Sequence, residues 1–184
     1  MTDTAAHHSS PDRLVAGPAR ALDAHAGILP ELTEWAAAHV PDGSKLNGAQ
    51  LAAIFAHSHH LKGLARAHPR SITETLSGRA ANVVATAMAE LETAASEINE
   101  ETAMIKAIRR LRQQSALAVA VADMAGIAPV DTQMGWLSAA AECALRAAVT
   151  YLFRQAARRG QIADKTVITA PGMAGCGWVV LALG

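Results

Sequence analysis

The densest group of charged side chains in this sequence is basic. Four cations stand within a short stretch and two amides follow them: Lys106, Arg109, Arg110, Arg112, Gln113 and Gln114. Guanidinium and ammonium groups bind phosphate oxygens well, so a helix carrying this cluster could hold a phosphate group. A solvated helix face whose cations pair with carboxylates of neighbouring helices is the simpler interpretation, and we favour it.

A second group that could do chemistry consists of histidines, at His57, His59, His60 and His68. On one continuous helix, His57 and His60 would share a face, and two such side chains can bind zinc. A zinc site normally needs at least a third protein ligand and supporting hydrogen bonds, which this segment does not supply. We therefore predict solvated histidines and no metal ligand.

Other sequence features that could indicate catalysis are weak. The glycine-rich run 172–177 looks like a nucleotide loop, but a dinucleotide fingerprint follows a strand and opens a helix, whereas here the glycines precede an apolar run. A linker is the better interpretation. Cys143 has no clear histidine partner and is predicted to be a small buried residue. The sequence contains no Asp-x-Asp pair, nucleophile elbow or Walker motif, so no catalytic residue is predicted.

The composition favours helices and excludes several classes of protein. Hydrophobic residues make up 51% of the 184 residues and aromatic residues only 3%, so the core must be built from small and aliphatic side chains, many of them good helix formers. A formal net charge of zero gives no general attraction to nucleic acid or to an anionic membrane. With two cysteines and no secretory signal, we expect a cytoplasmic protein with no nucleic-acid or membrane partner.

Apolar spacing and turn residues predict a mainly α-helical bundle. The expected helices are 30–39, 47–67, 71–76, 79–97, 99–125 and 131–159. Asn99 and Asp131 are the expected caps of the last two, which end at Gly126 and Gly160 and should be the longest pair, packed antiparallel. The inward face expected for 131–159 is Met134, Leu137, Ala141, Leu145, Ala148 and Leu152.

The sequence divides into four parts. Residues 1–11 are expected to be disordered, 12–160 to form the helical region and 161–177 to be a linker loop. The apolar run in 178–184 is typical of a strand buried on both faces. Because a lone strand cannot satisfy its own backbone groups, we expect 178–184 to be the first strand of a truncated second domain.

The order of these segments resembles one family. The sequence KAIRRLRQQSALAVAVADMAGI, a helix ending in LFRQAARRG, a variable loop and then WVVLALG is similar to the bifunctional glutamine synthetase adenylyltransferase / adenylyl-tyrosine phosphorylase. Upstream, AAIFAHSHHLKGLARAHPRSITETL also resembles a helical segment of that family. The resemblance runs from about Leu51 to Gly184. Its serial order, more than any single motif, carries it.

The resemblance implies nucleotidyltransferase chemistry in a complete enzyme. Gly184 would correspond to the start of a Gly-Lys-Leu-Gly-Gly turn in the nucleotide site, followed by an Asp-x-Asp pair that binds Mg²⁺. That enzyme would use Mg²⁺ with ATP, ADP and phosphate to remove, and add, AMP on a tyrosine of glutamine synthetase, under control of the PII signal-transduction protein, and so regulate nitrogen assimilation. The resembled part is the deadenylylating half. This chain stops before the catalytic residues, so we expect it to be inactive alone and to bind none of these cofactors.

Two other interpretations differ in class. The chain could be a self-contained helical protein-interaction module without catalysis, with the apolar run 178–184 as a tail that finds a partner. A helix-turn-helix regulator is disfavoured, because the neutral charge and the absence of a clustered recognition helix do not suit DNA binding.

Overall fold

A computed structural model describes residues 30–162, and within this range the chain is helical with no strand. The elements are α2 (Pro30–Ala37), α3 (Gly48–His57), α4 (His59–Ala67), α5 (Pro69–Glu74), the π-helical turn η2 (Thr75–Arg79), α6 (Ala80–Glu97), α7 (Glu101–Met124) and α8 (Val130–Arg158). The mainly helical prediction is confirmed for this range. The predictions for 1–11, for most of the linker 161–177 and for the strand 178–184 lie outside the described residues.

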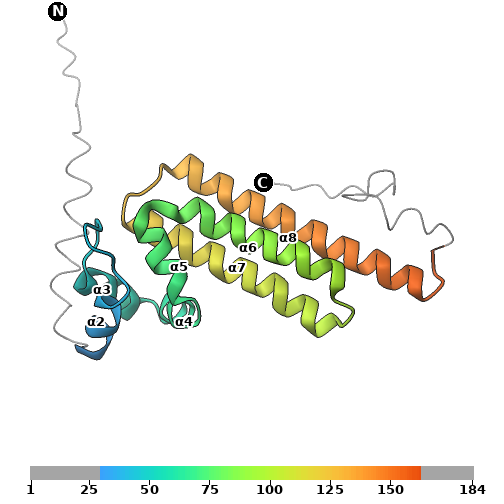
Figure 1. Cartoon of the computed structure of the whole chain (residues 1–184), viewed down its shortest axis with the longest axis horizontal. Helices are drawn as coiled ribbons and strands as arrows, with labels where there is room; N and C mark the ends of the chain where they lie inside the picture. The colour runs from blue at the N-terminus through green and yellow to red at the C-terminus, as the bar shows by residue number, and fades with distance from the viewer. Residues whose placement is uncertain (1–29, 163–184) are drawn as a thin grey trace, which may run out of the picture.

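Three long helices, α6, α7 and α8, lie side by side and form the body of the molecule (Figure 1). The connections between them are short, so that α7 runs antiparallel to both neighbours. With 24 and 29 residues, α7 and α8 are the longest helices of the described part. This confirms the predicted antiparallel pair.

The core has two parts, and α7 belongs to both. One cluster lies between α6, α7 and α8 and includes Leu91, Leu111 and Cys143. The other lies where the short helices α2 to α5 pack against the C-terminal half of α7, through Leu117 and Val121. The short helices gather at that end of the bundle (Figure 1). α7 therefore joins the short-helix end to the bundle.

The predicted stops of the two long helices are confirmed. Gly126 has φ = 59° and Gly160 has φ = 71°, in the left-handed region that glycine adopts without a steric penalty. The Ile127 N–H donates to the Ala122 carbonyl at 2.9 Å, which is the bond expected when a glycine ends a helix in this way.

The predicted single helix 47–67 is wrong, because the chain breaks at Ser58. There the backbone is extended (φ −131°, ψ 100°), and the Ser58 hydroxyl accepts a hydrogen bond from the Leu61 N–H at 3.2 Å. Ser58 thus ends α3 and caps α4. The serine hydroxyl can bond nearby backbone groups in place of the helical bonds, which favours a break at this residue. The apolar spacing continues across the break, so the sequence pattern did not predict it.

The two predicted caps are also wrong in detail. Glu100, not Asn99, is the extended residue before α7, and its side chain makes no capping bond. Pro129 occupies the same position before α8, and Asp131 lies in the first helical turn, where a carboxylate still interacts favourably with the helix dipole.

The face of α8 that packs into the bundle is not the predicted one. The buried residues of α8 are Gln133, Ala140, Cys143, Ala147 and Tyr151. The larger residues of the predicted face are exposed instead: Met134 56%, Leu137 37%, Leu145 46% and Leu152 62%. Small side chains let α8 pack closely against its neighbours. The sequence prediction instead chose the stripe with the larger aliphatic residues as the inward face.

Ser115 offers a test of how this packing stabilises the protein. It is 1% exposed on α7, and its hydroxyl has no hydrogen-bond partner within the described residues. An unsatisfied buried hydroxyl costs about 1–3 kcal/mol, and alanine has a higher helix propensity than serine. We expect Ser115→Ala to raise the free energy of unfolding by about 1 kcal/mol in urea titrations. Ser96→Ala is the control, because Ser96 is exposed and its hydroxyl donates to the Thr93 carbonyl; a loss of stability in Ser115→Ala would contradict the expectation.

Candidate functional site

The basic cluster lies on α7 and forms one broad face of the helix. Lys106, Arg109, Arg110 and Arg112 are all exposed. Lys106 and Arg110 are four residues apart and Arg109 is three from Lys106, so these three share a face. Arg112 is three residues from Arg109, so it lies beside Arg109, on the side of the face away from Arg110. The structure thus places all four predicted cations on one broad face of α7, with Arg110 and Arg112 at its two edges.

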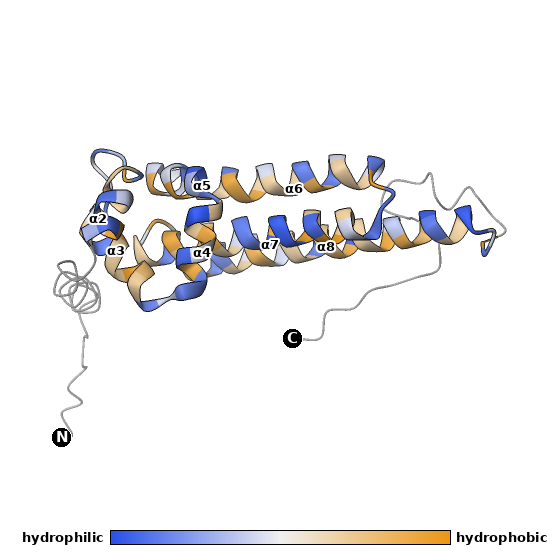
Figure 2. Ribbon diagram, turned by 90° about the horizontal axis from the view of Figure 1, so that it is seen from below, coloured by the Kyte–Doolittle hydropathy of each residue, from blue (hydrophilic) through white to orange (hydrophobic). Residues whose placement is uncertain are grey.

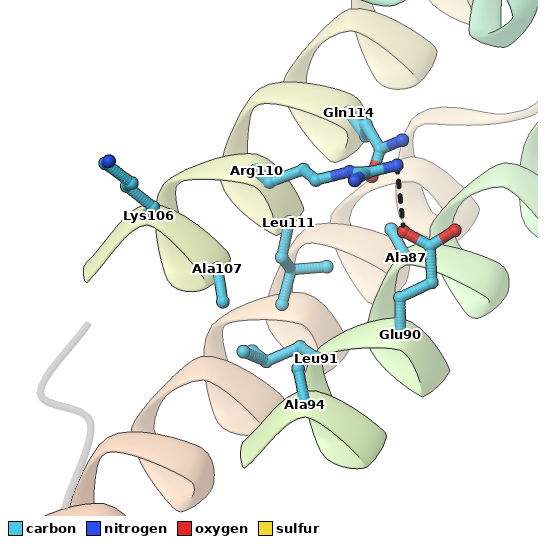
Figure 3. A pocket seen from close by; sticks show the side chains of 9 residues that line it. All are labelled: Ala87, Glu90, Leu91, Ala94, Lys106, Ala107, Arg110, Leu111 and Gln114. Carbon is cyan, nitrogen blue, oxygen red and sulfur yellow. Dashed lines mark ion pairs between the residues drawn. The ribbon is translucent and has the colours of Figure 1, made fainter. Parts of the chain in front are cut away.

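A shallow groove of about 250 Å³ runs between α6 and α7 beside these cations (Figure 3). Its floor is apolar and includes Leu91 and Leu111, while Glu90, Lys106 and Arg110 stand at its rim. One Arg110 Nη atom lies 3.3 Å from a Glu90 carboxylate oxygen, across the mouth of the groove. This is the pairing with a neighbouring helix that we favoured over a phosphate site.

The ion pair limits what the groove can bind. Arg110 and Glu90 are both about half exposed, so the pair contributes at most about 1 kcal/mol and can open. Glu90 also places a negative charge where a phosphate would have to sit. Lys106 and Arg109 form no ion pair within residues 30–162 and keep their positive charge available to a partner. The groove therefore suits a protein surface with carboxylates better than an enclosed anion.

Gln113 and Gln114, the two amides of the predicted cluster, have different surroundings. The Gln113 Oε1 atom lies 3.3 Å from His68 Nε2 and links α7 to the end of α4. Gln114 lines the groove, and its Oε1 atom is buried with no hydrogen-bond partner in the described part of the chain. Gln114 is therefore a candidate acceptor for a donor group that enters the groove.

The predicted histidine group is dispersed by the break at Ser58. His57 ends α3 whereas His59 and His60 begin α4, so His57 and His60 do not share a helix face. His68 lies at the other end of α4, against Gln113. Across residues 30–162, no three side chains of the types that bind metals come together in a possible metal site.

Cys143 is fully buried in the three-helix bundle, as predicted. Burial raises the pKa of its thiol, and the nearby Glu92 carboxylate raises it further. Since the thiolate is the reactive form, Cys143 is suited to packing rather than to nucleophilic chemistry.

Asn99 is a polar centre that the sequence analysis missed. Its main-chain carbonyl accepts hydrogen bonds from Gln155 Nε2 at 2.8 Å and from the Tyr151 hydroxyl at 3.2 Å. Its side-chain oxygen accepts from Arg154 and Arg158. These bonds fasten the α6–α7 connection to the last turns of α8. The spacing of the four donors, at i, i+3, i+4 and i+7 on one helix, is the signal that could have found them.

Two further predictions lie outside the described residues, namely the cofactor-binding assignment of Gly184 and the glycine-rich run 172–177 as a linker. None of the helices in 30–162 combines the length and the apolar character that crossing a bilayer requires.

Comparison with known proteins identifies the family to which this arrangement belongs. The sequence profile described as glutamate-ammonia ligase adenylyltransferase matches residues 48–183, which includes α3 to α8. No solved structure matches the chain.

Several curated relatives bear one name, bifunctional glutamine synthetase adenylyltransferase/adenylyl-removing enzyme. The Xanthobacter autotrophicus protein is 35% identical over 124 residues, which is 67% of this chain and 12% of the relative. The Caulobacter vibrioides protein is 32% identical over 126 residues, or 67% of this chain and 13% of the relative. The Rhodopseudomonas palustris protein is 31% identical over 170 residues, or 91% of this chain and 17% of the relative.

The chain spans about one eighth to one sixth of the length of these relatives. The matched profile nevertheless includes most of the described helices, the basic face of α7 and the polar residues that bind Asn99. The chain therefore belongs to the glutamate-ammonia ligase adenylyltransferase family.

Proposed function

We propose that this chain is a helical part of an enzyme that regulates glutamine synthetase by removing, and adding, AMP on a tyrosine. The observation that carries the proposal is the family match over residues 48–183. Within that enzyme, the packed α6–α7–α8 bundle acts as a scaffold beside the catalytic domain. We further propose a cytoplasmic location and the PII signal-transduction protein as a second partner.

The sequence lacks the paired aspartates that would hold Mg²⁺ in such an enzyme. Hydrolytic and phosphoryl-transfer sites that use Mg²⁺ hold it with carboxylates, and the sequence has no Asp-x-Asp pair. The described residues contain no cluster of metal-binding side chains either. We therefore assign this chain to positioning and binding and not to catalysis.

The basic face of α7 is the part best suited to contact a partner protein. Lys106 and Arg109 are exposed and carry charges that no carboxylate of the described residues neutralises through an ion pair. Charges at the rim of an interface steer association, so their reversal slows binding most at low salt. The apolar floor beside them, at Leu91 and Leu111, is too buried to supply much contact area.

The proposed function predicts binding without catalysis. The purified chain should bind glutamine synthetase or PII in a surface-binding experiment at low salt. Reversing both Lys106 and Arg109 to glutamate should weaken that binding by roughly ten-fold. Arg159→Glu is the matched control, because Arg159 is also an exposed cation but follows the last turn of α8 instead of lying on α7.

The same preparation should neither transfer AMP to glutamine synthetase nor remove it. The measurement is release of ADP from adenylylated glutamine synthetase with phosphate and Mg²⁺. Release by the purified chain would contradict the scaffold role. Absence of binding to both proteins would contradict the proposed partners, and equal weakening by Arg159→Glu would show that the α7 face is not the contact.

A further inference from the structure

α8 carries a row of large apolar side chains that face away from the bundle. Val130, Met134, Leu137, Leu145 and Leu152 are exposed by 65%, 56%, 37%, 46% and 62%. Their spacings of three, four, seven and eight residues keep them along one side of the helix. The row runs for about 33 Å, since it spans 22 residues at 1.5 Å each. Orange segments recur along α8 in Figure 2.

An exposed apolar row of this length needs an explanation. Single exposed leucines are ordinary, but contiguous apolar surface on a domain usually marks a contact site. The opposite side of α8 already supplies the bundle contacts through Ala140, Cys143 and Ala147. The row is therefore a second packing face on the same helix.

The row is hollowed at its C-terminal end. A depression of about 400 Å³ is lined by Val149, Leu152, Phe153, Ala156 and Ile162, all of them apolar. This is the end at which the chain leaves α8. A concave apolar surface holds an inserted side chain better than a flat one, because more of its area is removed from water.

We infer that this face and its hollow are the docking site for the chain's own apolar segment Trp178–Leu183. The segment reads WVVLAL and contains no polar side chain. Residues 163–177 join it to the end of the described part, and an extended linker of that length reaches about 50 Å. α8 is about 43 Å long, so every part of the row is within reach.

Covalent attachment favours this occupant over a second copy of the chain. A short tether gives an effective concentration of about a millimolar, well above that of another molecule in dilute solution. The hollow also lies next to the start of the linker, which keeps the closed loop short and its entropic cost small. This inference concerns the chain's own packing and holds whether or not the proposed partners bind.

The test uses Cys176, which stands two residues before Trp178. In the full chain, Ala156→Cys places a thiol at the hollow, and a short bifunctional maleimide should link it to Cys176 within one molecule. Ser96→Cys is the matched control, because Ser96 is exposed and lies beside α8 on the α6 side, away from the apolar row. We expect roughly ten-fold more intramolecular product from Ala156→Cys than from Ser96→Cys, as measured by peptide mass spectrometry.

Two further variants show whether the contact is apolar. Leu152→Asp on the face and Leu181→Asp in the segment should each remove that excess. Leu152 is exposed, so its replacement should leave the helical circular dichroism unchanged. Cys143 is buried and its peptide should stay unmodified in every variant. Equal cross-link yields from Ala156→Cys and Ser96→Cys would overturn the inference. So would a yield from Ala156→Cys that neither Leu152→Asp nor Leu181→Asp lowers. Product that joins two chains and grows with protein concentration would assign the face to a second copy instead.

Discussion

Replacing Leu111 with alanine is expected to lower the free energy of unfolding by about 2–5 kcal/mol. Leu111 is 2% exposed and packs on α7 against α6 and α8. Removing its branched end leaves a cavity among small neighbours such as Ala87 and Ala118, which cannot expand to fill the space. Urea unfolding followed by helical circular dichroism measures the change.

Leu145→Ala is the matched control for this prediction. It deletes the same atoms from α8, where Leu145 is 46% exposed. Because much of this side chain is already in water, the expected loss is at most about 1 kcal/mol. A loss as large as that of Leu111→Ala would mean that Leu145 is packed as tightly as a core residue.

This pair of leucines also shows what the sequence could and could not predict. The two apolar stripes of α8 are both real. One consists of large residues such as Met134 and Leu152, and the other of Ala140, Cys143 and Ala147. Periodicity locates both stripes but cannot say which of the two packs against the neighbouring helices. The choice depends on how closely α6 and α7 approach, which is a tertiary property.

Helix ends were predicted well where the backbone itself demands a residue type. Gly126 and Gly160 have positive φ and end α7 and α8, as their positions after long helical patterns indicated. Ends determined by competing side-chain bonds were not. Ser58 interrupts an apolar pattern that continues through it, and Asn99 bonds to α8 rather than to α7. Both depend on partners that spacing does not reveal.

For the candidate site, composition indicated the cations but not their arrangement. The sequence placed Lys106 to Arg112 on one helix, and spacings of three and four residues put all four cations on one broad face. The Glu90 carboxylate that holds Arg110 comes from α6, some twenty residues earlier, and only the folded pair of helices shows it. The family resemblance, by contrast, depended on segment order and is confirmed by the profile match.

Substituting Gly48 is expected to separate the first two helices of the described part. A Cβ atom at Gly48 would lie 2.6 Å from the Ala37 Cα atom and 2.8 Å from the Ala37 nitrogen. These are backbone atoms of the last residue of α2, so they cannot turn aside as a flexible side chain would. We expect Gly48→Ala to lower the free energy of unfolding by about 1–3 kcal/mol, since α2 must shift away from α3.

Gly63→Ala is the matched control for this prediction, because it should raise the free energy of unfolding. Gly63 lies within α4, and nothing stands within 4 Å of the position its Cβ would take. Alanine is favoured over glycine inside a helix by about 1 kcal/mol, so this variant should gain up to that amount. Gly48→Ala should show a loss, because Gly48 is the first residue of α3 and the clash with α2 outweighs any propensity gain there. The denaturant midpoint of Gly63→Ala should therefore be higher than that of the parent chain, and the midpoint of Gly48→Ala should be lower. A gain in both variants would show that α2 and α3 do not approach as closely as Ala37 and Gly48 indicate.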